Sequence, residues 1–377
     1  MFLMDVQCLI DKVNKCGRIV LYGNGQAAQS FYQWLKIKKL DYKLYGFMVT
    51  SKKDDYFMKK PIFEPGDKCL DDSELFVCVK KQFREEIIEV LREKGITKYT
   101  IVPEDFIAEI LHLLPRKACK FEVHIVEHCN LNCRGCFHCS PLAKKEFLSV
   151  KDFERDIQRL SELYDGNLEL MELLGGEPLL HPEITEFFRI ARVYFPKGKV
   201  ALVTNGILLL KMPENFWISA KKNNIELWPT YYPISVDYKA IQKKAESYEI
   251  KYNPFHITAD ENGRKLLENY HFDINGNEDA CNNFIKCYRG NLCIFLRHGK
   301  LYSCVIGGNM HHFSEYFKLK NMVIDENNGI DIYSAENIEE ISNFLVTPMQ
   351  ACKYCKLVDK PTLLPFQQSG KKMEEWL

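Results

Sequence analysis

The sequence has no excess of charge of either sign, since Lys and Arg total 51 and Asp and Glu also total 51. A surface that binds nucleic acid or anionic lipid usually needs a basic excess, so we expect no nucleic acid and no membrane among the partners. No apolar run approaches the roughly 18 residues of a membrane span. The first residues, MFLMDVQCLIDKV, also lack a basic stretch ahead of the apolar ones, as a signal peptide would have. These absences predict a cytoplasmic protein.

Cysteine is abundant, with 15 residues in a chain of 377. Ten of these cysteines fall in three groups, at 129–139, 281–304 and 352–355. Thiols stay reduced in the cytoplasm, where structural disulfides are uncommon. Grouped cysteines in such a compartment predict metal binding or redox chemistry.

Apolar segments alternate with amphipathic ones along most of the chain, and the length predicts two or three domains. In a first domain, residues 1–118, strands are expected at 17–25, 42–50, 74–80 and 99–103, with helices at 27–39 and 84–95. In a second domain, residues 119–280, strands are expected at 121–127, 168–176, 199–206, 225–232 and 249–257, with helices at 149–164, 182–195 and 237–247. This alternation predicts the α/β class with parallel sheets. Residues 281–377 form a third, cysteine-rich region that ends in a polar tail.

The densest cysteine group lies in EHCNLNCRGCFHCSPLA, residues 127–143. Cys129, Cys133 and Cys136 have the spacing C-x3-C-x2-C, and three thiolates on one loop can hold three irons of a cubane cluster while the fourth iron stays open. A structural zinc site would instead need four closed ligands, the fourth supplied by Cys139 or His138. The loop follows the first strand of the second domain, and ligand sites of parallel α/β sheets lie at such strand ends.

Two later segments follow the next two strands: GGEP at 175–178 and TNG at 204–206. With CNLNCRGC, GGEPLLHPE and VTNG in this order over about residues 120–280, the chain resembles the radical S-adenosylmethionine (radical SAM) superfamily. The resemblance implies a partial (β/α)6 TIM barrel and a [4Fe–4S] cluster whose open iron binds S-adenosylmethionine. The implied cluster ligands are Cys129, Cys133 and Cys136. The residues implied for S-adenosylmethionine are Gly175, Gly176, Glu177, Pro178, Asn205 and Thr230.

An enzyme of this kind cleaves S-adenosylmethionine reductively to a 5'-deoxyadenosyl radical, which removes a hydrogen atom from a substrate. The sequence departs from the family pattern at Gly135, where many members have an aromatic residue, so Phe137 is expected to cover the cluster instead. We expect Cys139 to be a packing residue that binds no metal. His128 and His138 are expected at the surface or around the ligands rather than among them.

A further cysteine pattern, CYRGNLCIFLRHGKLYSC, is followed downstream by CKYC. It resembles the SPASM/twitch extension of radical SAM enzymes, in the shorter twitch form with one auxiliary [4Fe–4S] cluster. The ligands that this resemblance implies are Cys287, Cys304, Cys352 and Cys355. Cys293 could replace Cys287, but it leaves only five residues before Gly299. A zinc ribbon built from the same cysteines is the alternative.

The segment YGNGQAA, residues 22–28, joins a predicted strand to a predicted helix, as in phosphate-binding loops. Gly23 and Gly25 are the possible phosphate-binding residues. The acidic residue that would bind an NAD ribose about 20 positions later is missing from 47–51, which argues against a dehydrogenase domain. The region resembles instead the Rossmann-like N-terminal domains of enzymes that modify nucleotide sugars. A domain that only supports or dimerises the protein remains the alternative.

The sequence therefore predicts a radical SAM enzyme with oxidoreductase or isomerase-type chemistry. A sugar or nucleotide-linked sugar is the expected small-molecule substrate, and a flavodoxin or ferredoxin the expected electron donor. One alternative is an enzyme that modifies a peptide; another is a zinc or iron–sulfur scaffold without activity. No acid, base or hydrogen donor is assigned, although four side chains near predicted strand ends are candidates: Tyr231, Tyr232, His256 and Arg297.

Overall fold

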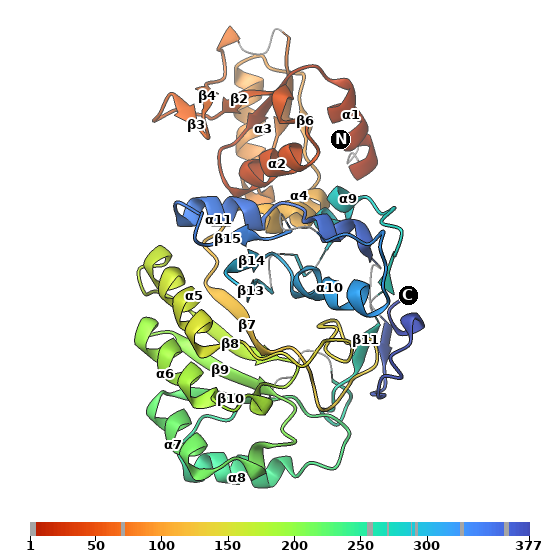
Figure 1. The fold of residues 1–377 in the computed structure, drawn as a ribbon. Helices are drawn as coiled ribbons and strands as arrows, with labels where there is room; N and C mark the ends of the chain where they lie inside the picture. Colours follow the sequence, from red (N-terminus) through yellow and green to blue (C-terminus); the bar gives the residue numbers. More distant parts are fainter. Residues whose placement is uncertain are drawn as a thin grey trace. The chain divides into compact units, whose positions relative to one another are not determined.

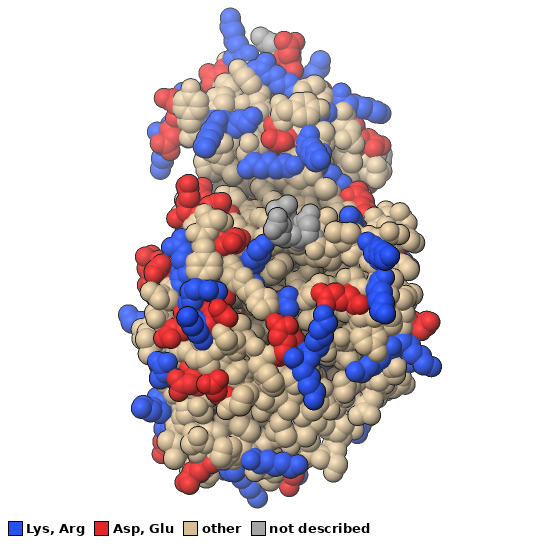
Figure 2. Space-filling view, viewed as in Figure 1, with Lys and Arg blue, Asp and Glu red and all other residues tan. Residues whose placement is uncertain are grey.

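The computed structural model describes residues 5–68, 72–254, 259–269, 271–287, 289–290, 293–324, 328–357 and 362–377. The chain divides into two compact units, residues 1–114 and 115–377, and each is described by itself (Figure 1). Acidic and basic side chains are mixed over the face of each unit seen in Figure 2, which agrees with the balanced composition. Among the described residues, no helix is long and apolar enough to cross a membrane.

The first unit is built on a six-stranded sheet of order β3-β4-β2-β1-β5-β6. Only β3 runs antiparallel to its neighbour, so five parallel strands, counted along the chain, have the order 3-2-1-4-5, as in doubly wound sheets. The strands are β1 (Ile19–Tyr22), β2 (Leu44–Met48), β3 (Tyr56–Phe57), β4 (Lys60–Phe63), β5 (Glu74–Val77) and β6 (Thr100–Ile101). The helices are α1 (Val6–Lys15), α2 (Gln26–Ile37), α3 (Arg84–Glu93) and α4 (Glu104–Ile110).

Aromatic packing holds this sheet to its helices. Phe31 and Trp34 of α2 contact the ring of Phe106 in α4, with centroid distances of 5.8 and 5.2 Å. Phe31 also packs against Phe76 of β5. Every residue of β1 is buried, which explains its uninterrupted apolar run. The parallel α/β arrangement predicted from the sequence is thereby confirmed.

The second unit contains a seven-stranded sheet of order β10-β9-β8-β7-β13-β14-β15. Its parallel part consists of β7 (Lys120–Val126), β8 (Leu170–Gly175), β9 (Lys199–Thr204), β10 (Ile225–Pro229) and β13 (Phe295–Arg297). The antiparallel strands β14 (Lys300–Tyr302) and β15 (Ile330–Asp331) extend it beyond β13. This sheet crosses the predicted boundary between residues 280 and 281.

The strand predicted at 249–257 does not form over its described part. There, Tyr252 makes a single bridge to Leu227 of β10, and residues 255–258 lie outside the described residues. Pro254 has no backbone N–H to donate to a strand ladder, so the pairing cannot continue through it.

Four helices follow the first four strands of this sheet in turn: α5 (Val150–Leu163), α6 (Ile184–Tyr194), α7 (Glu214–Lys222) and α8 (Tyr238–Ser247) (Figure 1). Helix α7 was not predicted. Ser149 caps α5, because its hydroxyl accepts a 3.0 Å hydrogen bond from the backbone N–H of Asp152. The apolar faces of these helices bury the outer side of the sheet in one large core.

Helix α10 (Val305–Tyr316) and the segment 349–354 form a second core with Trp376, next to Cys304 and Cys352. Of the other helices, α9 (Ala280–Lys286) leads to Cys287, and α11 (Ile338–Leu345) packs in the first core through Ile341 and Leu345. Two small antiparallel sheets pair β11 (Leu267–Asn269) with β17 (Thr362–Leu364), and β12 (His271–Phe272) with β16 (Cys355–Lys356). The polar tail expected at the C-terminus is in fact packed, since Trp376 is completely buried.

Candidate functional site: a thiol-lined cavity and a second thiol cluster

The loop after β7 brings Cys129, Cys133 and Cys136 to one cavity at the carboxyl ends of the parallel strands. Gly175, Gly176, Asn205 and Thr230 line the same cavity. The loops that follow β7, β8, β9 and β10 therefore meet here, as expected at this edge of a parallel sheet.

The two glycines of GGEP are required by the close approach of two backbone segments. A β-carbon at Gly175, whose φ is +138°, would lie 2.2 Å from the carbonyl oxygen of Val126. A β-carbon at Gly176 would lie 2.1 Å from the carbonyl oxygen of His128. The backbone N–H of Gly176 instead donates to the Val126 carbonyl at 2.8 Å. This contact fixes the GGEP loop against the strand that leads into the cysteine loop.

Glu177 is fully buried and ties the GGEP loop to the TNG loop, and neither it nor Pro178 is among the residues that line the cavity. One carboxylate oxygen accepts from the Thr204 hydroxyl at 2.6 Å, and the other accepts from the Asn205 backbone N–H at 2.9 Å. Burial raises the pKa of Glu177 to about 7, although these hydrogen bonds oppose the shift. Its predicted role toward S-adenosylmethionine remains a prediction.

Asn205 continues this connection to the cysteine loop. Its side-chain amide donates to the Asn130 side chain at 2.8 Å and lies 3.8 Å from the sulfur of Cys129. The backbone N–H of Thr230 donates to the Thr204 carbonyl at 2.8 Å, which places Thr230 beside the same loop. The three motifs named from the sequence are thus joined by hydrogen bonds.

Cys139 is completely buried in the second core and is not among the residues that line the cavity. Its backbone has a φ of +53°, and its N–H donates to the Cys136 carbonyl at 2.9 Å. This turn directs the fourth cysteine of the loop away from the other three.

The C-terminal tail packs on the cysteine loop, which the sequence did not indicate. The N–H of Arg134 donates to the Gln367 carbonyl at 2.9 Å, and the N–H of Ser369 donates to the Asn132 carbonyl at 2.7 Å. A β-carbon at Gly135, whose φ is +58°, would lie 2.9 Å from the carbonyl oxygen of Glu375. The tail therefore occupies the space that a side chain at position 135 would need.

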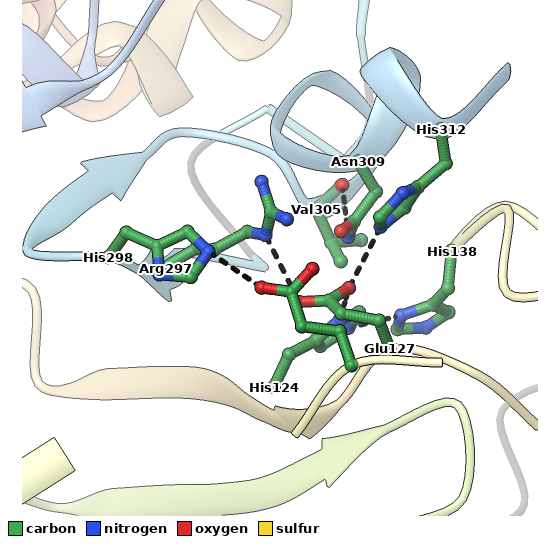
Figure 3. A network of polar contacts seen from close by, with 9 residues as sticks. His124, Glu127, His138, Arg297, His298, Val305, Asn309 and His312 are labelled. Carbon is green, nitrogen blue, oxygen red and sulfur yellow. Dashed lines mark hydrogen bonds and ion pairs between the residues drawn. The ribbon is translucent and has the colours of Figure 1, made fainter. Parts of the chain in front are cut away.

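A buried polar network centred on Glu127 lies next to this loop (Figure 3). Its carboxylate accepts hydrogen bonds from His312 of α10 at 2.9 Å and from Arg297 of β13 at 3.1 Å. His124 of β7 contacts the same carboxylate at 3.3 Å. Burial alone would raise the pKa of Glu127, but the hydrogen bonds from His124 and His312 outweigh it and hold that pKa well below its usual value.

The network fixes the tautomers of two histidines. Burial lowers the pKa of His124, so the ring is neutral and its single proton, on Nδ1, faces the Glu127 carboxylate. Nε2 of His124 must then accept the 2.7 Å hydrogen bond from Nδ1 of His138. His138, which lies between Cys136 and Cys139 in the sequence, lines the first cavity. The hydrogen bond to His124 orients its ring. The sequence offered no signal for Glu127 or His312.

A second cavity is lined by Cys287, Cys304, Cys352 and Cys355, among largely apolar walls that include Met310 and Met349. The four thiols come from four elements: Cys287 caps the end of α9, Cys304 precedes α10, Cys352 lies in a short 3-10 helix (Gln350–Tyr354), and Cys355 begins β16. Burial raises the pKa of Cys304 to about 11 and that of Cys355 to about 12. The charge of Cys287 adds to both shifts, which places these thiols near one another.

Cys293 does not line this second cavity. It lines the first, where its thiol is hydrogen-bonded to Glu122 of β7. Cys281 lies in α9, outside the residues that line either cavity. The geometry therefore groups Cys287, rather than Cys293, with the three later cysteines.

The remaining candidate residues belong to several parts of the fold. Gly23 and Gly25 form the turn from β1 to α2 in the first unit. The Tyr231 and Tyr252 hydroxyls are hydrogen-bonded at 3.1 Å, and Arg297 donates a hydrogen bond to Glu127. Tyr232 lines the first cavity next to Cys133. His256 lies outside the described residues.

Comparison with known proteins identifies part of the second unit. Residues 123–226, from β7 into β10, match the family described as the Radical SAM superfamily. The chain carries a radical SAM domain. This superfamily is one of enzymes that use a [4Fe–4S] cluster and S-adenosylmethionine, so the prediction of these two cofactors is confirmed.

Curated relatives are similar over part of the radical SAM domain. GTP 3',8-cyclase of Synechocystis sp. is 35% identical over 96 residues, which cover 25% of this chain and 28% of that protein. GTP 3',8-cyclase of Aliarcobacter butzleri is 30% identical over 116 residues, covering 30% of this chain and 35% of that protein. The chain thus spans about a third or less of the length of these relatives.

Solved structures with similar chains include BtrN in complex with AdoMet and 2-DOIA, at 14% identity and a TM-score of 0.41. That similarity covers 66% of this chain and 99% of BtrN. Streptococcus suis SuiB is 17% identical with a TM-score of 0.24, covering 50% of this chain and 54% of SuiB. These scores are too low to support an inference about the substrate.

The donor set of the first cavity fits an iron–sulfur cluster. Burial raises the pKa of Cys129 to about 12 and that of Cys133 well above its usual value, so the thiols need a metal to become thiolates. Among the described residues, no three His, Cys, Asp or Glu side chains converge as ligands of a single metal ion do. A cubane requires less convergence, because each thiolate binds a different iron.

Proposed function

We propose that this protein is a radical SAM enzyme with one auxiliary [4Fe–4S] cluster that removes a hydrogen atom from a small-molecule substrate. Cys129, Cys133 and Cys136 would hold the first cluster and leave one iron for S-adenosylmethionine. The cofactor residues would be Gly175, Gly176, Glu177, Pro178, Asn205 and Thr230. With an electron from a flavodoxin or ferredoxin, the bound cofactors supply a 5'-deoxyadenosyl radical.

The observation that carries this proposal is the meeting of the loops after β7, β8, β9 and β10 at one cavity. Glu177 and Asn205 join these loops through hydrogen bonds that are buried or partly buried, so the cavity wall is held in place. Such preorganisation is the protein's main contribution when a cofactor supplies the reactive species. The wall also contains Phe137 and Leu174, which limit the access of water to a reactive radical.

The second thiol group supports the auxiliary cluster. Four partly buried cysteines around an apolar cavity would saturate a [4Fe–4S] cluster and leave no iron for the substrate. Such a cluster can accept an electron from a substrate radical, which suits a dehydrogenation. Arg289 lines both cavities and therefore lies between the two predicted clusters.

For the substrate, we propose a sugar or nucleotide-linked sugar that undergoes dehydrogenation or epimerisation. The first unit supports this choice through the strand order of its sheet and through the glycine turn at Gly23 and Gly25, where a nucleotide phosphate would bind. A peptide substrate is the second candidate.

Anaerobic reconstitution with iron and sulfide tests the reaction class. We expect about eight irons per chain and the formation of 5'-deoxyadenosine from S-adenosylmethionine with a strong reductant. Zinc in place of iron, together with intact S-adenosylmethionine, would refute the proposal. Titration of the whole protein with UDP-glucose and with a candidate peptide would then separate the two substrate classes.

A further inference from the structure

The inner end of the first cavity carries two carboxylates side by side. Glu122 of β7 and Glu172 of β8 are register partners in parallel neighbouring strands, and both line the cavity. Neighbouring strands lie about 4.8 Å apart, so the two side chains emerge next to each other. Glu122 stands four residues before the end of β7 and Glu172 three residues before the end of β8, so both lie about 10–13 Å below the level of the cysteine loop.

The surroundings do not compensate the charge of this pair. No described residue donates a hydrogen bond to Glu172, and Lys120 acts on it only through its charge. Glu122 interacts with the Cys293 thiol and feels the charge of Arg289. Arg289, however, is paired directly with Glu268.

Like charges that share a site disfavour ionisation. Burial raises the pKa of Glu172 to about 8, with the charge of Glu122 adding to the shift, and burial raises the pKa of Glu122 to about 7. The pair thus offers both an O–H donor and carboxylate acceptors near neutral pH. A fold that keeps such a pair facing a cavity loses stability, as binding sites commonly do.

We propose that Glu122 and Glu172 bind the substrate through its hydroxyl or ammonium groups, so that the bound part is polyhydroxylated or amino-substituted and carries no phosphate. This inference rests on the proposed function, because the same cavity would hold S-adenosylmethionine at its outer end. A substrate bound between the strand ends and the two carboxylates would contact S-adenosylmethionine on one side and the carboxylates on the other. Two neighbouring carboxylates can each accept from adjacent hydroxyls or from one ammonium group, whereas they repel a phosphate.

A stability measurement tests the pair without a known substrate. The variant Glu172→Gln keeps the shape and removes the charge, so the reconstituted holoenzyme should melt above wild type at pH 8. The matched control is Glu226→Gln in β10, because Glu226 is also a strand carboxylate with little exposure but accepts hydrogen bonds from Trp228 at 3.1 Å and Asn253 at 3.0 Å and pairs with Lys251. It should melt below wild type. If Glu172→Gln and Glu122→Gln both melt below wild type, the carboxylates are structural and the proposal fails.

Binding of simple probes tests the ligand class. D-Glucosamine, D-glucose and GTP are added separately to wild type and to Glu172→Gln, and the melting temperature is recorded. We expect a sugar to raise the melting temperature of wild type and not of the variant. An effect of glucosamine alone identifies the ammonium group as the ligand, and an effect of both sugars identifies the hydroxyls.

The proposal is overturned if neither sugar acts on wild type, if the variant responds equally, or if GTP alone acts. The rate of 5'-deoxyadenosine formation by wild type separates this failure from a failure of the proposed function. When the nucleoside forms but no sugar binds, only the present inference is lost. When no nucleoside forms, the proposed function is lost.

Discussion

The indole N–H of Trp376 donates a 3.0 Å hydrogen bond to the carbonyl oxygen of Cys136. These residues are separated by 240 positions in the chain. Trp376 is fully buried and packs near Phe313 of α10, with a centroid distance of 6.1 Å. The C-terminal tail therefore fixes the backbone of Cys136, the third cysteine of the loop, and connects it to the second core.

Replacing Trp376 by Phe should loosen the cysteine loop. The change removes the donor to Cys136 and part of a buried ring, so we expect a loss of about 1–3 kcal/mol in unfolding free energy and faster iron release. Anaerobic denaturation and the decay of the cluster absorbance measure the two effects. Leu377→Ala, at a partly exposed neighbour, is the control and should change neither; equal effects of both variants would contradict the role of Trp376.

Cys139→Ala should leave the first cluster intact, because Cys139 is buried in the core away from the cavity. Cys133→Ala should abolish that cluster, since only two thiolates of the loop would remain. Iron content and electron paramagnetic resonance of the reduced proteins distinguish the two variants. If both variants lost the cluster alike, our assignment of Cys139 would be wrong.

Cys287→Ala should remove the auxiliary cluster, whereas Cys293→Ala should retain it. The reason is that Cys287 lines the second cavity with the other three thiols, while Cys293 lines the first. Iron analysis should find about four irons fewer per chain in the first variant and no change in the second. The reverse result would exchange the roles of these cysteines.

Stability should fall with rising pH because of Glu172. Its pKa is raised in the folded protein, so the folded state binds more protons than the unfolded state between its usual pKa and about 8. The stabilisation by Glu172→Gln relative to wild type should therefore grow from pH 5 to pH 8 and then level off. The charged groups that act on Glu172 are Glu122 and Lys120 of β7; Ala201, its partner on β9, carries no charge. A difference independent of pH would contradict this prediction.

Glu127→Gln should destabilise the protein by about 3–5 kcal/mol, since it leaves the largely buried guanidinium of Arg297 without its carboxylate. The hydrogen bonds that orient His124 and, through it, His138 would also weaken. Chemical denaturation measures the loss. Glu146→Gln is the matched control, because the Glu146 carboxylate makes an exposed contact of 3.5 Å with His298, and we expect a change below about 1 kcal/mol.

Local signals in the sequence were sufficient for much of the fold. Apolar runs located β1, β7, β8 and β9, because strands of a parallel sheet are buried on both faces. The helix α10 was missed: its residues are buried on nearly all sides, so it lacks the one-sided apolar pattern by which an amphipathic helix is recognised. The strand predicted at 249–257 does not form over its described part. The prediction relied on the apolar pattern and ignored Pro254, which interrupts strand pairing.

The sequence by itself determined the radical SAM domain, since the spacing of Cys129, Cys133 and Cys136 and the order of the GGEP and TNG segments are local properties of the chain. The spacing to Gly299 favoured Cys287 over Cys293, but only the tertiary structure decided which cysteines face which cavity, because Cys293 meets Glu122 of β7 only in the folded sheet. The same holds for the pairing of Glu122 with Glu172, the Glu127 network and the Trp376 contact. In each case the residues come into contact only when the chain folds, and nothing in the sequence around them indicates which residues will be neighbours.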